Sequence, residues 1–337
     1  MSDGIDQILK PLTIGIVGAG RIVEDVHLPV LKNIPLVRIS WITDVDSKNR
    51  KRVGSMYGIK DRHPDKVFSG PEEIDIYLLA IPLNARDNYL RSIAASGNAA
   101  YVEKPFASSA KDHRDIISHF VSGNIFSGFQ RRFYNTAQTL KAIVDGGEFG
   151  RLHSVRAFQG SYNLRSNFMR AWGEDQKRYS GGLVMDSAIH ILDQILYALS
   201  CKKIRSVSAD GIVHGGVDYD VRIKSILTRE DGDVEADCRF SRLTNLGDRI
   251  ELLFDKARVE CGLQPSDPVL AHSKGRRVRY QSSFSFGRYF AAKTVNQAFA
   301  YNWMDCIRSA RNGVAAISSA KNSILTSEWV EEIYKCL

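Results

Sequence analysis

Short apolar runs alternate with helical patterns over the first third of the chain. "LTIGIVGAG" (12–20), "VRISWITDVD" (37–46), "IDIYLLAIP" (74–82) and "AAYVEKP" (99–105) have the length and residue content of strands. Between the first two, "VEDVHLPVLKNI" (23–34) spaces its apolar residues as on one face of a helix. A run such as "IYLLAI", apolar at every position, is typical of a strand covered on both faces. The pattern therefore predicts a parallel, doubly wound sheet with helices on both sides.

The pattern changes after Phe129, where strand-like segments follow one another directly. A helical stretch, "TLKAIVDGG", leads into the alternating segment "RLHSVRAFQGSY". Further strand-like segments are "IRSVSADGIV", "DVRIKSILTRE", "DVEADCRFSR" and "RIELLFD", and turns such as "EDGDV" (230–234) suit hairpins. Helical patterns return at "AFAYNWMDCIRSAR" and "SILTSEWVEEIYKCL". We predict a large, mainly antiparallel open sheet with one face free to pack on a partner.

Length and pattern together predict an α/β protein of two domains. A chain of 337 residues is longer than one compact core usually requires. The change of pattern puts the boundary near Ser127, with a doubly wound domain over 10–127 and a second domain over 128–337.

Composition removes several classes of protein. Hydrophobic residues make up 44% of the chain and charged residues 25%, as in ordinary globular proteins. The start, "MSDGIDQILKPL", lacks the pattern of a secretory signal, and the longest apolar run, "IYLLAIPL", is too short to cross a bilayer. We therefore expect a cytoplasmic protein with no membrane partner. Five scattered cysteines without a C-x-x-C pair favour reduced thiols over disulfides or a zinc site.

The net charge of +8 favours an anionic ligand. Basic residues are interleaved with acidic ones and spread along the chain. We therefore expect no nucleic-acid partner, and an anionic small substrate or cofactor accounts for the charge.

Gly18, Gly20 and Val23 form a G-x-G-x-x-V pattern directly after the first predicted strand. Gly18 permits the tight turn, and Gly20 lets backbone N–H groups approach a pyrophosphate at the start of the helix. The third position departs from the usual glycine and would widen the spacing between helix and strand. The strand-to-helix context favours dinucleotide binding over an empty structural turn.

Asp44 ends the second predicted strand, where a carboxylate can accept hydrogen bonds from the adenosine ribose and repel a 2′-phosphate. This favours NAD. The alternative is NADP, because four basic residues follow closely and one of them could reach a 2′-phosphate: Lys48, Arg50, Lys51 and Arg52. The same four residues also suit a solvated helix face.

The segment "SGGLVMDSAIHILDQILYALS" (180–200) carries the strongest catalytic pattern. Asp186 and His190 are four residues apart on one helix face, and Asp193 is three further on. A polar stripe on an otherwise apolar helix is costly unless it lines a cavity or finds partners. The pattern predicts a functional site; a satisfied buried network and a metal site are the alternatives. His27, on the first helix, is interpreted as a packing or surface histidine.

The loop before this helix is rich in arginines and aromatic residues. It contains Tyr162, Arg165, Arg170, Trp172, Lys177, Arg178 and Tyr179. Arginines suit a carboxylate or phosphate, and aromatic rings suit the apolar faces of a sugar. With Arg131 and Arg132 near the domain boundary, the loop indicates an anionic sugar or sugar nucleotide, and a solvated loop is the alternative.

The chain resembles the Gfo/Idh/MocA family, the glucose-fructose oxidoreductase and inositol dehydrogenase type of NAD(P)-dependent oxidoreductase. The matching pieces are "GIVGAGRI" with "HLPVL", then "VEKP", "GGLVMDSAIHILD" and "ISSAKNSILTSEWVEEIY". The resemblance implies an N-terminal Rossmann domain and a C-terminal α/β domain with an open sheet. That C-terminal domain would bind substrate and mediate a homodimer or homotetramer.

The resemblance also implies roles at matching positions. Lys104 would contact the substrate and the nicotinamide ribose, His190 would be the acid/base, and Asp186 would bind or orient a substrate hydroxyl. Pro105 would follow a cis peptide. The cofactor would contact Gly18, Gly20, Arg21, Ile22, Asp44, Ile81, Pro82, Glu103 and Lys104. The resemblance and the arginine-rich, aromatic loop together predict substrate contacts at Lys104, Arg132, Tyr162, Arg165, Trp172, Asp186 and His190, and we expect no metal ion.

One departure from the family lies near the expected nicotinamide. Relatives usually carry a "TPN…H" run after the fourth strand, and this chain has "IPLNAR" (81–86), with Leu83 and Arg86 replacing Asn and His. Cofactor contacts there are expected to differ.

The resulting hypothesis is a reversible hydride transfer between the nicotinamide and a secondary alcohol carbon of a sugar, cyclitol or sugar nucleotide. His190 would take the hydroxyl proton, and Lys104 would stabilise the developing alkoxide. Two alternatives stay open. One is an enzyme that recycles tightly bound NAD without net redox change, and the other is a catalytically silent NAD-binding regulator.

Overall fold

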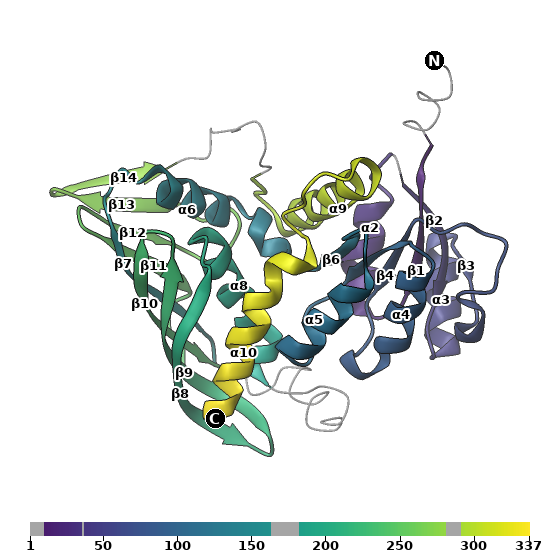
Figure 1. The fold of residues 1–337 in the computed structure, drawn as a ribbon, viewed down its shortest axis with the longest axis horizontal. Helices are drawn as coiled ribbons and strands as arrows, with labels where there is room; N and C mark the ends of the chain where they lie inside the picture. The colour runs from purple at the N-terminus through teal and green to yellow at the C-terminus, as the bar shows by residue number, and fades with distance from the viewer. Residues whose placement is uncertain (1–9, 36, 163–181, 281–290) are drawn as a thin grey trace. The chain divides into compact units, whose positions relative to one another are not determined.

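The computed structural model describes residues 10–35, 37–162, 182–280 and 291–337 (Figure 1). The chain forms two compact units, each built from more than one stretch of sequence. Unit 1 comprises Met1–Phe106, Lys111–Gly128 and Phe299–Asn322, and unit 2 comprises Ala107–Ala110, Phe129–Ala298 and Ser323–Leu337.

Unit 1 contains a six-stranded parallel sheet in the order β3-β2-β1-β4-β5-β6. Its strands are β1 (Leu12–Val17), β2 (Val37–Thr43), β3 (Lys60–Asp61), β4 (Ile76–Leu79), β5 (Ala99–Val102) and β6 (Ile125–Ser127). All residues of β4 and β5 are buried, as their continuous apolar sequences predict. The strand order reverses between β1 and β4, which makes this the doubly wound Rossmann arrangement and confirms the expected fold class.

Helices flank this sheet. They are η1 (Val23–His27), α2 (Leu28–Leu31), α3 (Ser47–Tyr57), η2 (Pro64–Lys66), η3 (Leu83–Ala85), α4 (Asp87–Ala95), α5 (Ala110–His119), α9 (Val295–Asn312) and η6 (Ala320–Ser323). The first helix opens with a widened turn in which the N–H of Leu28 donates to the carbonyl of Val23. Pro29, which has no N–H to donate, follows directly. The predicted single helix is therefore a π-turn joined to a short α-helix.

The chain returns to unit 1 near its end. The ring of Trp303, on α9, stacks on that of Tyr101 with centroids 4.4 Å apart. The Asn302 amide donates to the Tyr101 hydroxyl at 2.9 Å. Trp303, Phe299 and Cys306 belong to the same buried cluster as the β1 and β4 side chains. A single domain boundary near residue 127 does not include this C-terminal segment, which belongs to unit 1.

Unit 2 contains an eight-stranded sheet in the order β14-β13-β12-β11-β7-β10-β9-β8. Its strands are β7 (Leu152–Gly160), β8 (Lys203–His214), β9 (Val217–Arg229), β10 (Gly232–Ser241), β11 (Arg249–Phe254), β12 (Arg258–Cys261), β13 (Val269–Ser273) and β14 (Arg276–Tyr280). Neighbouring strands are antiparallel except β7 and β10. The predicted antiparallel sheet is confirmed, including the β9–β10 hairpin.

Strands β12 to β14 were not among the predicted strands. β12 has only four residues, and four of the five residues of β14 are exposed, so neither produces a long or clear alternation. Both are held by antiparallel pairing with β13.

Helices cover one face of the unit 2 sheet (Figure 1). They are η4 (Gln130–Phe133), α6 (Asn135–Gly146), η5 (Val184–Ala188), α8 (Ile189–Ala198) and α10 (Ile324–Cys336). Alternate residues of β9 and β10 point toward these helices and are buried. Within the described part of the chain, no helix combines the length and apolarity needed to span a membrane.

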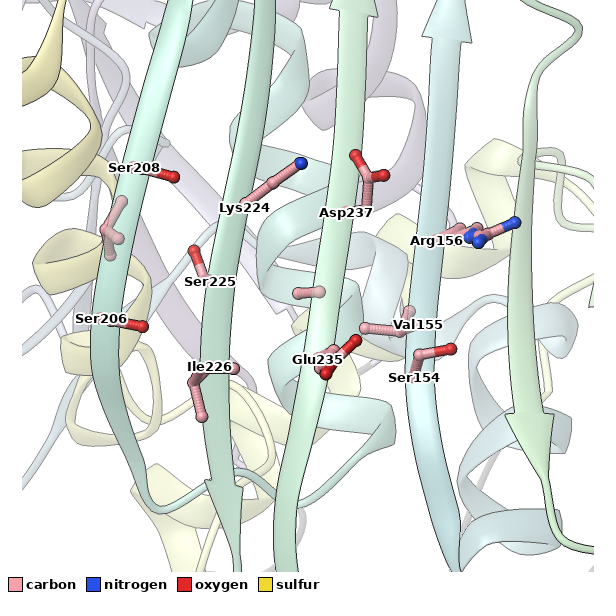
Figure 2. A pocket seen from close by; sticks show the side chains of 12 residues that line it. Ser154, Val155, Arg156, Ser206, Ser208, Lys224, Ser225, Ile226, Glu235 and Asp237 are labelled. Carbon is pink, nitrogen blue, oxygen red and sulfur yellow. The ribbon is translucent and has the colours of Figure 1, made fainter.

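The opposite face of the same sheet carries a shallow pocket between β7, β8, β9 and β10 (Figure 2). Its polar lining includes Ser154, Arg156, Ser206, Ser208, Lys224, Glu235 and Asp237. Acidic and basic side chains lie on neighbouring strands here, since Asp237 is paired in register with both Lys224 and Arg156. This face is polar and of mixed charge.

Candidate functional site

The glycine turn follows β1 in unit 1. Gly18 has a φ of +106°, and a Cβ there would lie 2.4 Å from the Ala80 carbonyl oxygen, so only glycine fits. A Cβ on Gly20 would meet no atom of the described residues within 4 Å. The turn thus leaves open space where a helix begins, which fits the pyrophosphate of a dinucleotide. Val23, at the departing third position, is fully buried.

Asp44 holds this turn from the end of β2. Its carboxylate accepts hydrogen bonds from the N–H groups of Ala19 at 2.7 Å and Asp46 at 2.9 Å. The Asn49 amide donates to the Ala19 carbonyl at 2.6 Å. Asp44 therefore lies beside the glycine turn, as a carboxylate that binds a ribose must.

Two of the four basic residues after Asp44 are engaged elsewhere. Arg50 is buried and donates to the Asp44 carbonyl at 2.8 Å. Arg52 donates two hydrogen bonds of 2.6 Å to the Glu24 carboxylate. Lys48 and Lys51 remain exposed. The two arginines are thus committed to structural contacts, which weakens the NADP alternative.

The other expected cofactor residues lie at the same edge of the sheet. Arg21 and Ile22 are exposed in the first turn after Gly20. Ile81 and Pro82 follow β4 and are partly buried. Since carboxyl ends of parallel strands share one edge, these residues all lie around the crevice of the Rossmann sheet.

The "EKP" segment follows β5 and is held by a chain of buried contacts. Glu103 contacts His27 Nε2 through its Oε1 at 2.8 Å, and its Oε2 accepts from the Lys104 N–H at 3.1 Å. The Trp303 indole donates to His27 Nδ1 at 3.0 Å. Because an indole N–H only donates, Nδ1 must accept, and Nε2 carries the hydrogen that Glu103 accepts. The Lys104–Pro105 peptide is cis, as the resemblance implied.

Arg86 reaches the same segment from another side. Its guanidinium donates to the carbonyl oxygens of Ile81 at 2.8 Å and Glu103 at 2.7 Å, and it also contacts those of Pro105 and Phe106. Burial lowers the pKa of Arg86 to about 10, and the charge of Glu103 opposes this shift. Arg86 is therefore a buried cation at neutral pH.

Asp186 and His190 lie at the start of the long buried helix of unit 2. Asp186 falls in the π-turn η5, and His190 is in the first turn of α8. His190 is only 8% exposed and packs edge-on against Phe129, with ring centroids 6.3 Å apart. Asp186 accepts a hydrogen bond from Arg242 at 3.0 Å. Widened turns of this kind occur often at functional sites.

Asp193 and Arg132 form a buried ion pair in the core of unit 2. Arg132 Nε and Nη2 donate to the two Asp193 oxygens at 2.8 and 2.6 Å, and Thr326 donates to the same carboxylate at 2.8 Å. Arg132 is 2% exposed, and Asp193 is fully buried. For Asp193 this geometry matches the alternative of a satisfied buried network. The Arg132 guanidinium, expected at the substrate, is occupied by this carboxylate.

Arg131 directly precedes Arg132 in the sequence and has different surroundings. Its guanidinium is over the ring of Tyr134 at 5.8 Å. Burial lowers the pKa of Arg131, and the negative charges of Asp248 and Asp186 oppose this shift. Its Nε and Nη1 are buried and donate no hydrogen bond to any described residue. Arg131 is thus a better candidate for a ligand contact in unit 2 than Arg132.

The start of the helical segment that carries Asp186 and His190 is fixed by Asp218 and Tyr334. Asp218 accepts from the Val184 N–H at 2.7 Å and from the Tyr334 hydroxyl at 2.9 Å. The same hydroxyl accepts from the Gly182 N–H at 3.1 Å. Burial raises the pKa of Asp218, and these hydrogen bonds oppose the shift. Asp218 therefore acts as the cap that the helix's own sequence does not provide.

The remaining predicted substrate residues are either exposed or outside the described residues. Tyr162, two residues after the end of β7, is 72% exposed. Arg165, Trp172 and the rest of that aromatic loop lie outside the described residues. Over the described ranges, no three His, Cys, Asp or Glu side chains group together in a way that could hold a metal ion.

Sequence reasoning missed the contacts of Arg86, Arg242, Asp218 and Trp303. Arg86 had been noticed only as a departure from the family pattern. The others carry no local signal, since Trp303 is 276 residues from His27 and Arg242 is 56 from Asp186.

Two family models match the chain over separate ranges. The model described as "Oxidoreductase family, NAD-binding Rossmann fold" matches residues 12–124. The model described as "GFO/IDH/MocA C-terminal domain" matches residues 137–260. Together they account for more than half of the 337 residues.

Individual proteins with known names are similar at lower identity. A myo-inositol 2-dehydrogenase from Thermotoga maritima is 25% identical over 291 residues, 82% of this chain and 84% of that protein. The aldose-aldose oxidoreductase of Caulobacter crescentus, solved with glycerol, superposes with a TM-score of 0.81 at 18% identity and covers 97% of each chain. The 3-ketoreductase of Actinomadura kijaniata, solved with NADP and TDP-benzene, gives a TM-score of 0.78 at 15% identity, over 97% of this chain and 98% of that one. The two solved structures share the fold.

Proposed function

The chain belongs to the Gfo/Idh/MocA family of NAD(P)-dependent oxidoreductases, and we propose that it transfers a hydride between a nicotinamide and a secondary alcohol or ketone carbon. The substrate is a sugar, cyclitol or sugar nucleotide. The observation that carries this proposal is one edge of the Rossmann sheet, where the Gly18–Gly20 turn follows β1, Asp44 follows β2 and Lys104 follows β5. A relative named for myo-inositol oxidation supports a polyhydroxylated substrate.

Lys104, His190 and Asp186 divide the chemistry among them in this proposal. When bound, the nicotinamide supplies a carbon that accepts or returns the hydride. As the alcohol is oxidised, its C–H bond gives up the hydride and its O–H bond gives up a proton, which His190 accepts. The Lys104 ammonium stabilises the negative charge that develops on the oxygen. Asp186 accepts a hydrogen bond from a neighbouring substrate hydroxyl and sets its orientation.

The preferred cofactor is NAD. Asp44 lies beside the glycine turn, where its charge would repel a 2′-phosphate, and Arg50 and Arg52 are bound to other groups. In unit 2, Arg131 supports a substrate that offers hydrogen-bond acceptors, including an anionic sugar.

We also propose that the chain forms a homodimer or homotetramer through the open face of the unit 2 sheet (Figure 2). That face presents Lys224 and Arg156 beside Glu235 and Asp237, so a second copy offers each charge an opposite partner. Sedimentation velocity of the full chain distinguishes monomer, dimer and tetramer.

The test of function is a screen for NADH or NADPH formation against sugars, uronates, inositols and nucleotide sugars. We expect turnover with NAD and at least one of these alcohols. Lys104→Ala and His190→Ala should still bind NADH while kcat falls by about 10²- to 10⁴-fold. The exposed Arg91→Ala on α4 is the control and should keep the wild-type kcat. Unchanged turnover in both catalytic variants would contradict the mechanism.

The two alternatives predict different results in the same screen. An enzyme that recycles its cofactor would retain NAD through purification and form no net NADH. A regulator would bind NADH, show no turnover with any alcohol, and lose nothing on substitution of His190.

A further inference from the structure

Burial of the Arg86 guanidinium costs free energy, because the charged group loses its hydration. It is only 5% exposed. Within the described chain its hydrogen-bond partners are all backbone carbonyls, and none is a carboxylate. A guanidinium remains charged even with its pKa lowered to about 10. An apolar side chain would fill this space at a lower desolvation cost. We therefore infer that the buried guanidinium is placed here to donate hydrogen bonds to these carbonyls.

Those carbonyls belong to two loops at the crevice. Ile81 follows β4, while Glu103, Pro105 and Phe106 lie in the segment after β5. The two loops would otherwise end in carbonyl groups without donors, since neither continues its strand. Arg86 joins them and contacts carbonyls on both sides of Lys104.

The base of the Arg86 side chain is itself fixed. Arg86 stands at the start of α4, and its carbonyl accepts from the Leu90 N–H at 3.0 Å. Its head is planar and offers five donors in a fixed geometry. The start of α4 therefore fixes the planar Arg86 guanidinium beside the loop that carries Lys104. Independently, His27 contacts the Glu103 side chain of the same loop.

We propose that Arg86 is a positioning residue, whose guanidinium fork sets the path of the backbone at Lys104 and at Ile81 on the nicotinamide side of the crevice. The inference rests on the proposed function, in which Lys104 meets the substrate and cofactor. Displacement of a catalytic group by about 1 Å can cost about 10²-fold in rate. Arg86 therefore acts on kcat and on the nicotinamide half of the cofactor, and it leaves the adenosine half unaffected.

The first test uses NADH and ADP as probes and needs no substrate. ADP reports on the Gly18–Gly20 turn and Asp44, which Arg86 does not contact. In Arg86→Ala we expect the Kd of ADP to stay within about twofold of wild type, while the Kd of NADH rises about tenfold. Equal changes in both constants, or none, would overturn the inference. A wild-type protein that binds neither NADH nor NADPH would instead overturn the proposed function.

The second test uses the panel alcohol that the wild type oxidises fastest. We expect kcat of Arg86→Ala to fall about 10²-fold with KM changed less than about threefold, and millimolar guanidinium to restore at least part of kcat. Arg86→Lys keeps the charge but not the planar guanidinium, and should lose about tenfold in kcat with a smaller fall in Tm than Arg86→Ala. Wild-type kcat in Arg86→Lys would overturn the inference even if Arg86→Ala fails to fold. Arg91→Ala, on the same helix but exposed, is the matched control and should match wild type.

Discussion

The two units fix their candidate catalytic residues by different means. In unit 1, Lys104 lies outside regular secondary structure, and Arg86 donates to the backbone carbonyls around it. In unit 2, Asp186 and His190 lie on a helix, and the fixing contacts go to a side chain, Asp193, further along that helix. A buried arginine makes the contacts in each unit: Arg86 in unit 1 and Arg132 in unit 2.

The difference follows from where each backbone has unsatisfied groups. A loop leaves its carbonyls without partners, so a side chain with many donors can bind the backbone directly. A helix satisfies its interior carbonyls, so its first N–H groups, its last carbonyl groups and its side chains remain available. Unit 2 accordingly uses Asp218 at the helix start and the Arg132–Asp193 pair in its middle. A loop-borne catalytic residue is therefore positioned through its backbone, and a helix-borne one through the placement of its whole helix.

The largest expected effect tests the helix side of this comparison. Arg132→Ala leaves Asp193 charged and buried, with Thr326 as its remaining side-chain partner among the described residues. Loss of one member of a buried pair typically costs about 3–5 kcal/mol, so we expect a fall of that size in the free energy of unfolding, measured with urea. Arg205→Ala breaks an exposed pair in the same unit and should cost less than about 1 kcal/mol.

A paired replacement, Arg132→Met with Asp193→Leu, sharpens the comparison. Apolar replacement of both partners can restore stability, so the double variant should unfold near the wild-type urea midpoint. If its kcat is also wild-type, the pair contributes stability alone and does not position the helix.

A loss of stability of intermediate size is expected in unit 1, where Trp303 supports the segment that carries Lys104. Trp303→Phe keeps the ring that stacks on Tyr101 but leaves His27 Nδ1 without its donor. An unsatisfied buried acceptor costs about 1–3 kcal/mol. Nitrogen chemical shifts of His27 should show the Nε2–H tautomer in the wild type and a mixture in the variant. A wild type already mixed would contradict the chain of contacts from Trp303 to Glu103.

The smallest expected effect is a pH-dependent change in stability on substitution of Asp218. Because burial raises its pKa in the folded state, the folded protein binds this proton more tightly than the unfolded chain. The resulting stability is fully present below the unfolded pKa and is lost as pH rises through the folded pKa. Asp218→Asn cannot titrate, so it should be less stable than wild type at acid pH, with the gap narrowing to about 1 kcal/mol or less near pH 7. Parallel curves of Tm against pH would contradict this assignment.

Local patterns in the sequence predicted much of the fold and part of the site. The Gly18–Gly20 turn and the buried strands are encoded by neighbours in sequence, so both sheets could be expected. The spacing of Asp186 and His190 predicted a helix, but the π-turn that holds Asp186 was not foreseen. Arg132 shows the limit most clearly, since its sequence position says nothing of whether its partner will be a ligand or Asp193.

Contacts between distant segments account for what the sequence did not reveal. Arg86 was visible as an unusual residue, and its role appears only when the loops after β4 and β5 lie together. Trp303 belongs to a helix expected in the second domain, and it completes the core of the first.

That return of α9 has a consequence for biosynthesis. The Trp303 indole, which donates to His27, leaves the ribosome only after all eight strands of the unit 2 sheet have been translated. Unit 1 cannot complete its interior as the nascent chain first emerges, whereas β7 to β14 are contiguous and can pair earlier. A gene fragment ending at residue 127 would therefore yield a nucleotide-binding unit without the aromatic support beneath its lysine, and such fragments should be prone to degradation in the cell.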